Sequence, residues 1–177
     1  MRILQICWCL LTAALAMGED APSGLRLKLS VAGRSTVRVV SNVHLFVPTG
    51  ESASPLLAAG RTDAEWTGYV NADLRGDYRF KANVNGVLKV EVNGQVVLSG
   101  DVSKPGAEVR LNKGPNKFKV SFAGPAKGDA FVRLLWSEYG FLWEPIHRGQ
   151  FTRDPEDAAL TKANSILRGR ELFLEGR

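Results

Sequence analysis

The sequence is poor in the residues that most often carry catalysis and metal binding. It has only two cysteines, Cys7 and Cys9, and two histidines, His44 and His147. Both cysteines lie in an N-terminal segment that we expect to be removed, so the mature chain would have no disulfide and no cysteine metal site. Neither histidine has a Ser or Cys partner in an arrangement typical of nucleophilic catalysis. Hydrolase and zinc chemistry therefore lack support.

Long apolar runs are also scarce. The N-terminus has one Arg, an uncharged apolar run and then Ala14-Leu15-Ala16, the three zones of a secretory signal peptide. The run is shorter than the roughly 20 residues that a helix needs to cross a bilayer. We therefore interpret residues 1–16 as a signal peptide, and we expect an exported, periplasmic or extracellular protein with no transmembrane anchor. At about 160 residues, the mature chain is long enough to be stabilised by its core alone.

The charged residues form no block. The chain has 23 basic and 18 acidic side chains, a net charge of +5, which becomes +4 without Arg2. The basic residues alternate with apolar ones, a pattern typical of solvated strand faces and not of a nucleic-acid arm. A glycosidase would need two carboxylates across a cleft, whereas most acids here lie in turns or at exposed strand positions. We expect a module without catalytic activity and without a nucleic-acid partner.

The chain between Leu25 and Trp143 has the pattern of short β-strands. Residues 25–31 alternate strictly between apolar and polar side chains, as in a strand with one buried face. The clearest hairpin joins residues 87–92 to 95–98 through Asn93-Gly94, a pair that favours the positive φ angles of a type I′ turn. Further expectations are strands at 37–40, 43–47 and 131–136, a loop at 55–61, and a second hairpin pairing 108–111 with 117–122. The predicted fold class is all-β, an antiparallel β-sandwich or barrel.

Aromatic residues fall into two groups. Five lie at inward-facing strand positions and are predicted to pack in the core: Trp66, Tyr78, Phe80, Phe122 and Trp136. Three others lie in a predicted loop over residues 137–145: Tyr139, Phe141 and Trp143. These three could stack on sugar rings or close the barrel against the tail. We favour closure, because Pro145 and a helix start follow at once.

The pattern becomes helical after the predicted barrel. Asp154 is a capping residue, Pro155 fits the first turn, and two acids follow. Apolar residues then recur at helical spacing through Leu167. We expect a short C-terminal helical tail over residues 154–177.

Five stretches, in order, resemble the protective-antigen domain family, a β-barrel module of glycosidases, fungal adhesins and bacterial toxins. They are Trp66–Val70, Gly76–Phe80, Leu88–Gly94, Val109–Gly114 and Phe131–Trp136. The resemblance extends over residues 24–146. It implies a binding or docking module for a glycan or another cell-surface ligand, held by loops at one end of the barrel.

The resemblance also points to a difference in metal binding. Carbohydrate-binding members of this family hold calcium with two adjacent Asp residues before a Gly, because a hard cation needs several oxygen ligands. Here Val84-Asn85-Gly86 occupies that place, and Asn93 replaces the Asp usual before the hairpin Gly. We therefore expect no metal site. The candidate ligand-binding residues are Asn83, Asn85, Asn93, Tyr139 and Trp143. A calcium-dependent carbohydrate-binding lectin and a purely structural spacer domain stay open as alternatives.

The last ten residues resemble the first helix of a c-type cytochrome. Gly169, Leu172 and Phe173 match a Gly-x-x-Leu-Phe segment that in that family runs into Cys-x-x-Cys-His, where haem is attached. The resemblance implies that residues 154–177 are a linker and the first helix of a cytochrome c domain in the same polypeptide. We expect no cofactor within this chain, and haem c only if the chain continues beyond Arg177.

Overall fold

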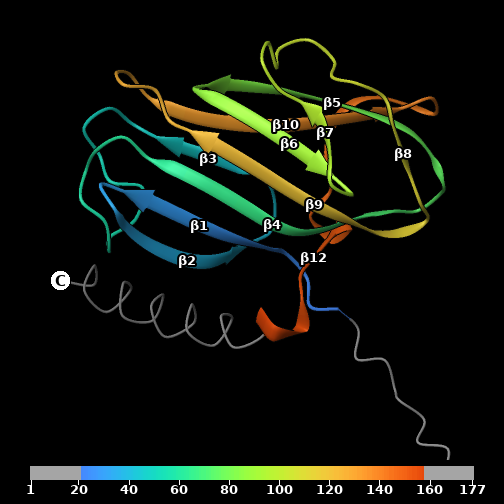
Figure 1. Cartoon of the computed structure of the whole chain (residues 1–177), viewed down its shortest axis with the longest axis horizontal. Helices are drawn as coiled ribbons and strands as arrows, with labels where there is room; N and C mark the ends of the chain where they lie inside the picture. The colour runs from blue at the N-terminus through green and yellow to red at the C-terminus, as the bar shows by residue number, and fades with distance from the viewer. Residues whose placement is uncertain (1–20, 158–177) are drawn as a thin grey trace, which may run out of the picture.

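Two antiparallel β-sheets pack face to face around a shared core (Figure 1). The computed structural model describes residues 21–157. The predicted signal peptide and most of the predicted helical tail, including its cytochrome-like helix, lie outside this range. Within it, the all-β antiparallel sandwich predicted from the alternating pattern is confirmed.

The larger sheet has seven strands. Six are ordered β2-β1-β4-β9-β6-β7, and β12 pairs with β4 beside β1. Their bounds are β1 Leu25–Val31, β2 Arg34–Val40, β4 Asp63–Ala72, β6 Val87–Val92, β7 Gln95–Leu98, β9 Gly114–Ala123 and β12 Phe151–Thr152.

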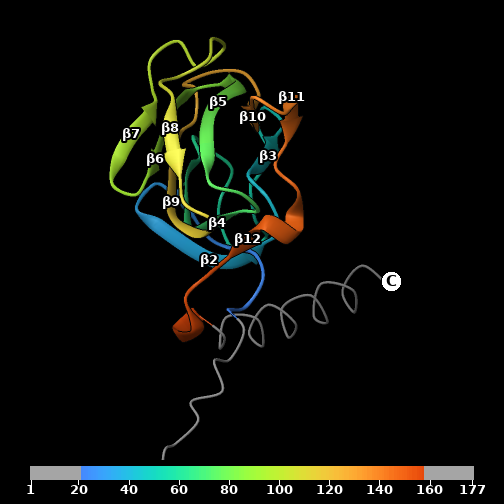
Figure 2. The same cartoon turned by 90° about the vertical axis from the view of Figure 1, so that its right-hand side faces the viewer.

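The smaller sheet has five strands, ordered β11-β10-β5-β8, with β3 also paired to β10. Their bounds are β3 His44–Val47, β5 Gly76–Asn85, β8 Val109–Leu111, β10 Ala130–Glu138 and β11 Phe141–Pro145. β3 pairs with residues 130–133 of β10, and β11 pairs with residues 135–138. The two short strands therefore follow one another along the same edge of β10 (Figure 2).

The predicted Asn-Gly hairpin is confirmed. β6 and β7 are joined by Asn93 and Gly94, whose φ angles are 51° and 82°. Both values lie in the left-handed region that a type I′ turn requires. The two-residue turn sets the register of the hairpin, and in this register Leu88, Val90 and Val92 all point into the core.

The second predicted hairpin is wrong. β8 pairs with β5 in the smaller sheet, whereas β9 pairs with β4 and β6 in the larger one. The buried Asn116 explains the corner between them: its Oδ1 accepts a hydrogen bond from the Asn112 amide (3.0 Å), and its Nδ2 donates to the Asn112 carbonyl (2.8 Å). These bonds hold the segment that carries the chain from one sheet to the other. Alternating side chains fit either pairing, so the sequence pattern could not separate them.

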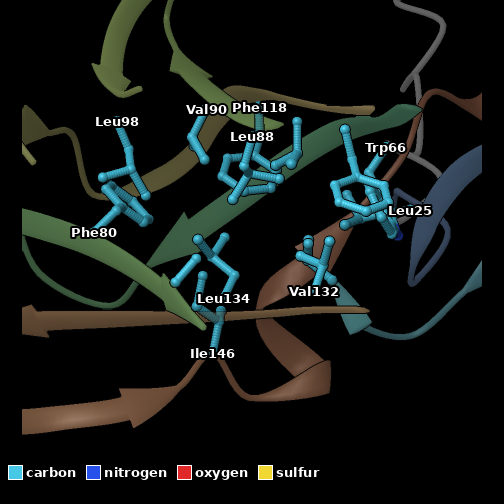
Figure 3. Close-up of a cluster of buried hydrophobic side chains, with 14 of the residues drawn as sticks. Leu25, Trp66, Phe80, Leu88, Val90, Leu98, Phe118, Val132, Leu134 and Ile146 are labelled. Carbon is cyan, nitrogen blue, oxygen red and sulfur yellow. The ribbon is translucent and has the colours of Figure 1, made fainter. Parts of the chain in front are cut away.

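The core lies between the sheets and receives side chains from both (Figure 3). All five aromatic residues predicted to be internal are buried: Trp66, Tyr78, Phe80, Phe122 and Trp136. Phe118 of the larger sheet faces Phe80 of the smaller one, with ring centroids 6.3 Å apart. Burial of these rings removes large apolar areas from water and is the main stabilising contribution to the fold.

The two ends of the described chain meet on the larger sheet. The Gly24 amide donates to the Phe151 carbonyl (2.8 Å), and β12 adds residues beyond the predicted boundary at Ile146. The Tyr69 hydroxyl donates to Asp154 (2.7 Å), and this carboxylate raises the pKa of the phenol. The predicted helix start at Pro155 is present as a 3₁₀ turn, η2, over Pro155–Asp157. None of the helices among residues 21–157 is long and apolar enough to cross a membrane.

The strands define two ends of the sandwich. The proximal end holds the β6–β7 and β10–β11 turns and lies nearer Gly24 and β12, because β12 pairs with Tyr69 and Val70 of β4 and Gly24 is hydrogen-bonded to Phe151. The distal end holds the β5–β6 turn and the connections 48–62 and 124–129. The entry and exit of the chain are therefore away from the distal loops.

Candidate functional site

Three segments of the distal end are cross-linked by side-chain hydrogen bonds. Asn85, at the end of β5, donates from Nδ2 to the Asp129 carbonyl (2.7 Å). The Asp129 carboxylate in turn accepts from the Thr49 amide (2.8 Å) and the Thr49 hydroxyl (2.7 Å). Hydrogen bonds between protein groups thus fasten the β5–β6 turn to both long connections.

The Thr49 bonds also set the ionisation of Asp129. The hydroxyl and then the amide of Thr49 hold the pKa of this carboxyl below its ordinary value, because both donate to the charged form. A lowered folded-state pKa makes a stabilising contribution that is present above the ordinary Asp pKa and lost as the pH falls through the lowered value. The distal cross-link is therefore fully formed at neutral pH.

The distal residues do not fit a calcium ion. Val84, in place of the first expected carboxylate, is an apolar side chain packed against the core. Asn85 already binds Asp129, and Asp129 is engaged by Thr49. Across residues 21–157, no group of three or more His, Cys, Asp or Glu side chains is placed to hold a metal. A hard cation needs six or more oxygen ligands, and this end does not gather them.

A shallow pocket of about 280 Å³ opens between the two long distal connections. Its charged or polar side chains include Thr49, Glu51, Arg61 and Lys127, and prolines and glycines form much of its wall. The volume is just below the 300–1,000 Å³ that is typical of small-molecule sites. It suits the terminal part of a ligand and not a wholly enclosed molecule.

A second set of side chains lies on the outer face of the smaller sheet. Register pairs Phe46 with Phe131, and Arg133 with Asn83, across adjacent strands. Lys81 is opposite Leu135, and its Nζ lies 4.6 Å from the centroid of the Trp143 ring. The structure thus brings two predicted candidates, Asn83 and Trp143, to one face.

Sequence reasoning missed Phe46, Phe131, Arg133 and Lys81 as members of this face. A signal was present in Leu45-Phe46-Val47, where three consecutive apolar residues occupy a half-buried strand. Strand side chains alternate between faces, so the middle residue must point out, and Phe46 is 58% exposed.

A pocket of about 350 Å³ adjoins this face beside β10, between the start of β3 at His44 and the end of β11 at Pro145. The buried Val43, Leu134, Ile146 and Phe151 line its inner part, while His44 and Arg133 lie on its exposed side. An apolar interior with a few polar groups at the mouth is the usual composition of a ligand pocket.

The remaining candidates lie at the proximal end. Asn93 donates from Nδ2 to Asn116 Oδ1 (3.0 Å), and its own Oδ1 accepts from the Lys117 amide (2.9 Å). Its amide group therefore joins the β6–β7 turn to β9. Tyr139 is fully exposed in the β10–β11 turn. Neither residue lies near Asn85 at the distal end.

The predicted loop over residues 137–145 is a hairpin, β10–β11, because its backbone continues the pairing of the sheet edge. The predicted closure against the tail is not what Phe141 provides: it packs on Trp136 of β10 (5.7 Å between centroids) and Tyr78 of β5 (6.3 Å), and so covers the core itself. The prediction of closure is wrong for Tyr139, which points into solvent. The side chain that packs the tail onto the core is instead Phe151, 5.6 Å from Phe118.

Comparison with known proteins identifies the fold. No protein-family model and no curated protein matches the sequence. Among solved structures, the chain is similar to an anti-sigma factor domain-containing protein from Clostridium clariflavum, with TM-score 0.62 and 16% identity over 74% of this chain. The chain spans only 47% of that protein's length.

Two other structures are matched over nearly their whole length. The PA14 sugar-binding domain of an RTX adhesin has TM-score 0.62 and 17% identity, covering 76% of this chain and 99% of that one. The Epithelial Adhesin 6 A domain of Candida glabrata, solved with Galb1-3GlcNAc, has TM-score 0.59 and 12% identity, covering 77% of this chain and 88% of that one. The two sheets described above are thus an all-β sandwich with the fold of PA14, the protective-antigen domain.

Proposed function

We propose that this chain is an exported, non-catalytic module that binds a carbohydrate or another cell-surface ligand through its distal end. The observation that carries the proposal is the set of loops around Asn85, Thr49 and Asp129, fastened together by hydrogen bonds between these residues. Support for a carbohydrate comes from the two adhesin domains of the same fold, one named as sugar-binding and one solved with a disaccharide.

Binding at this end would be independent of calcium. The hydrogen bonds from Asn85 and Thr49 to Asp129 already fix the loops that a metal would otherwise hold together. Preorganisation of this kind lowers the entropic cost of binding, whichever group provides it. A calcium-dependent lectin is therefore the weaker alternative for this chain.

A purely structural spacer is also the weaker alternative. A spacer separates the parts of a polypeptide that it joins. Here the segments at Gly24 and Phe151 are hydrogen-bonded neighbours, so the distal loops lie away from the point where the chain leaves the sandwich at β12. Loops that lie away from this point are accessible to a ligand, which suits a binding module better than a spacer.

We further propose that the barrel precedes a haem-bearing electron-transfer domain in the same polypeptide and positions it. The support is the cytochrome-like arrangement of Gly169, Leu172 and Phe173, together with the exit of the chain beside β12, away from the distal loops. The reading frame beyond Arg177 is expected to continue within a few residues into Cys-x-x-Cys-His. A stop codon directly after Arg177 would contradict this part of the proposal.

The main test is glycan binding with and without calcium. The secreted chain is applied to an immobilised panel of cell-surface oligosaccharides in calcium or in excess EDTA. We expect the same binding in both, and no rise of the melting temperature with calcium; a ligand at 100 times its Kd would stabilise the fold by about 2.7 kcal/mol. Lys127→Ala removes a side chain of the distal pocket and should weaken binding. Lys28→Ala removes an exposed side chain of β1 in the larger sheet and should not weaken it. Binding that requires calcium would overturn the proposal.

A further inference from the structure

Two phenylalanines form an exposed aromatic surface on the smaller sheet. Phe46 of β3 and Phe131 of β10 are directly opposite in register, and they are 58% and 36% exposed. Directly opposite residues have Cβ atoms about 5 Å apart, so their rings border one another on the same face. Single exposed apolar residues are ordinary, whereas adjoining exposed aromatic residues are candidates for contact with a ligand.

Two cations of the same sheet face have no acidic partner among the described residues. Arg133 is two residues further along β10, and Lys81 lies on the neighbouring strand β5. None of the ion pairs formed within residues 21–157 includes either residue. Two acidic side chains where β5 pairs with β8 already form ion pairs with other residues: Glu108 binds Arg79 (2.9 Å), and Asp77 binds Arg110 (3.2 Å).

Trp143 is a third aromatic residue on this face of the smaller sheet. Trp143 of β11 is held beside Lys81, whose Nζ lies 4.6 Å from its ring centroid. Strands rise about 3.4 Å per residue, so the step from Phe131 to Leu135, which faces Lys81, covers about 14 Å. Asn83, opposite Arg133, adds an exposed amide in between. We call Phe46, Phe131, Arg133, Asn83, Lys81 and Trp143 the outer strip.

We propose that the outer strip is a second, linear subsite that binds an oligosaccharide in which uronic acids are separated by neutral sugars. This inference rests on the proposed function that the domain binds carbohydrate. Aromatic faces pack against the apolar face of a neutral sugar ring, and the Asn83 amide bonds hydroxyl groups. The guanidinium of Arg133 matches the planar carboxylate of a uronate with two parallel hydrogen bonds, and Lys81 provides a second cation.

The sparse charge favours such an oligosaccharide over a nucleic acid. A nucleic acid presents a phosphate at every nucleotide, and proteins bind it with a continuous basic groove. The outer strip has only two free cations over about 14 Å. An aromatic surface with few charges suits a chain that alternates charged and neutral rings.

The experiment measures binding of a hexasaccharide of alternating glucuronate and N-acetylglucosamine to the full chain by calorimetry. The matched probe is the same hexasaccharide with its carboxylates reduced to alcohols, and a single-stranded deoxythymidine oligonucleotide is the third probe. We expect the acidic hexasaccharide to bind at least about tenfold more tightly than the reduced one. Arg133→Ala and Phe46→Ala should each weaken its binding about tenfold.

Control variants separate this subsite from the distal end and from unfolding. Arg75→Ala and Leu74→Ala remove an exposed arginine and an exposed apolar side chain elsewhere, and both should leave binding and melting temperature unchanged. The outer strip is overturned if Arg133→Ala binds like the parent, if the reduced probe binds equally well, or if the oligonucleotide binds more tightly. Neutral glycan binding that is sensitive only to Lys127→Ala would keep the proposed function and reject the outer strip. No binding to any glycan would reject both.

Discussion

Replacing Trp66 by alanine is expected to lower the free energy of unfolding by about 4 kcal/mol. Trp66 is completely buried in the middle of β4, between Leu27 of β1 and Val120 of β9. Its removal leaves a cavity that the flanking strands cannot close, because their backbones are fixed by hydrogen bonds on both sides. A loss of this size is a large part of the stability of an ordinary domain.

The matched control is Trp143→Ala, which deletes the same atoms from the outer face of β11. Trp143 is only half buried, and the interaction with Lys81 is worth about 1 kcal/mol. Urea unfolding followed by circular dichroism compares the two variants with the parent at constant pH. Equal losses for Trp66→Ala and Trp143→Ala would show that the core is not centred where the two sheets meet.

The second large effect is expected at the β5–β6 turn of the distal end. A Cβ built on Gly86 would lie 2.5 Å from Phe122 Cε2 and 2.6 Å from the Ala123 carbonyl oxygen. Gly86 also has φ of +137°, which L side chains rarely adopt. Gly86→Ala should therefore cost about 3 kcal/mol through overpacking and backbone strain. It should also weaken distal binding, because Asn85 precedes the turn.

Gly94→Ala provides the matched control in the β6–β7 turn. Gly94 has φ of +82°, but nothing lies within 4 Å of its added Cβ. Only the left-handed conformation is penalised, so the expected cost is about 1 kcal/mol. Thermal melts of both variants measure the difference. A Gly86→Ala variant as stable as Gly94→Ala would show that β5 and β6 do not approach β9 as described.

The features that sequence predicted correctly are those set by neighbours in the chain. The Asn93-Gly94 turn depends on two local φ angles, and the strict alternation of Leu25, Leu27 and Leu29 fixes which side of β1 is buried. The two missing carboxylates at Val84 and Asn85 are also a purely local fact, and the absence of calcium binding that they suggest stays a prediction.

Pairing between distant strands was beyond sequence reasoning. A strand such as Val109–Leu111 presents the same alternation to any partner, and it was wrongly paired with the strand that follows it. Trp143 was placed in a loop because nothing in residues 137–145 signals that β10 leaves an open edge there.

The sequence by itself thus determined the regularly alternating strands, the buried aromatic rings and the tight hairpin, because period-two alternation and turn chemistry act over a few residues. Only the tertiary structure decided which exposed side chains meet. Phe46 and Phe131 are far apart in the chain and become neighbours solely through the β3–β10 register. The link between Asn85, Asp129 and Thr49 likewise joins three separate segments. Such surfaces depend on non-local pairing, which hydrophobic burial selects and no local pattern encodes.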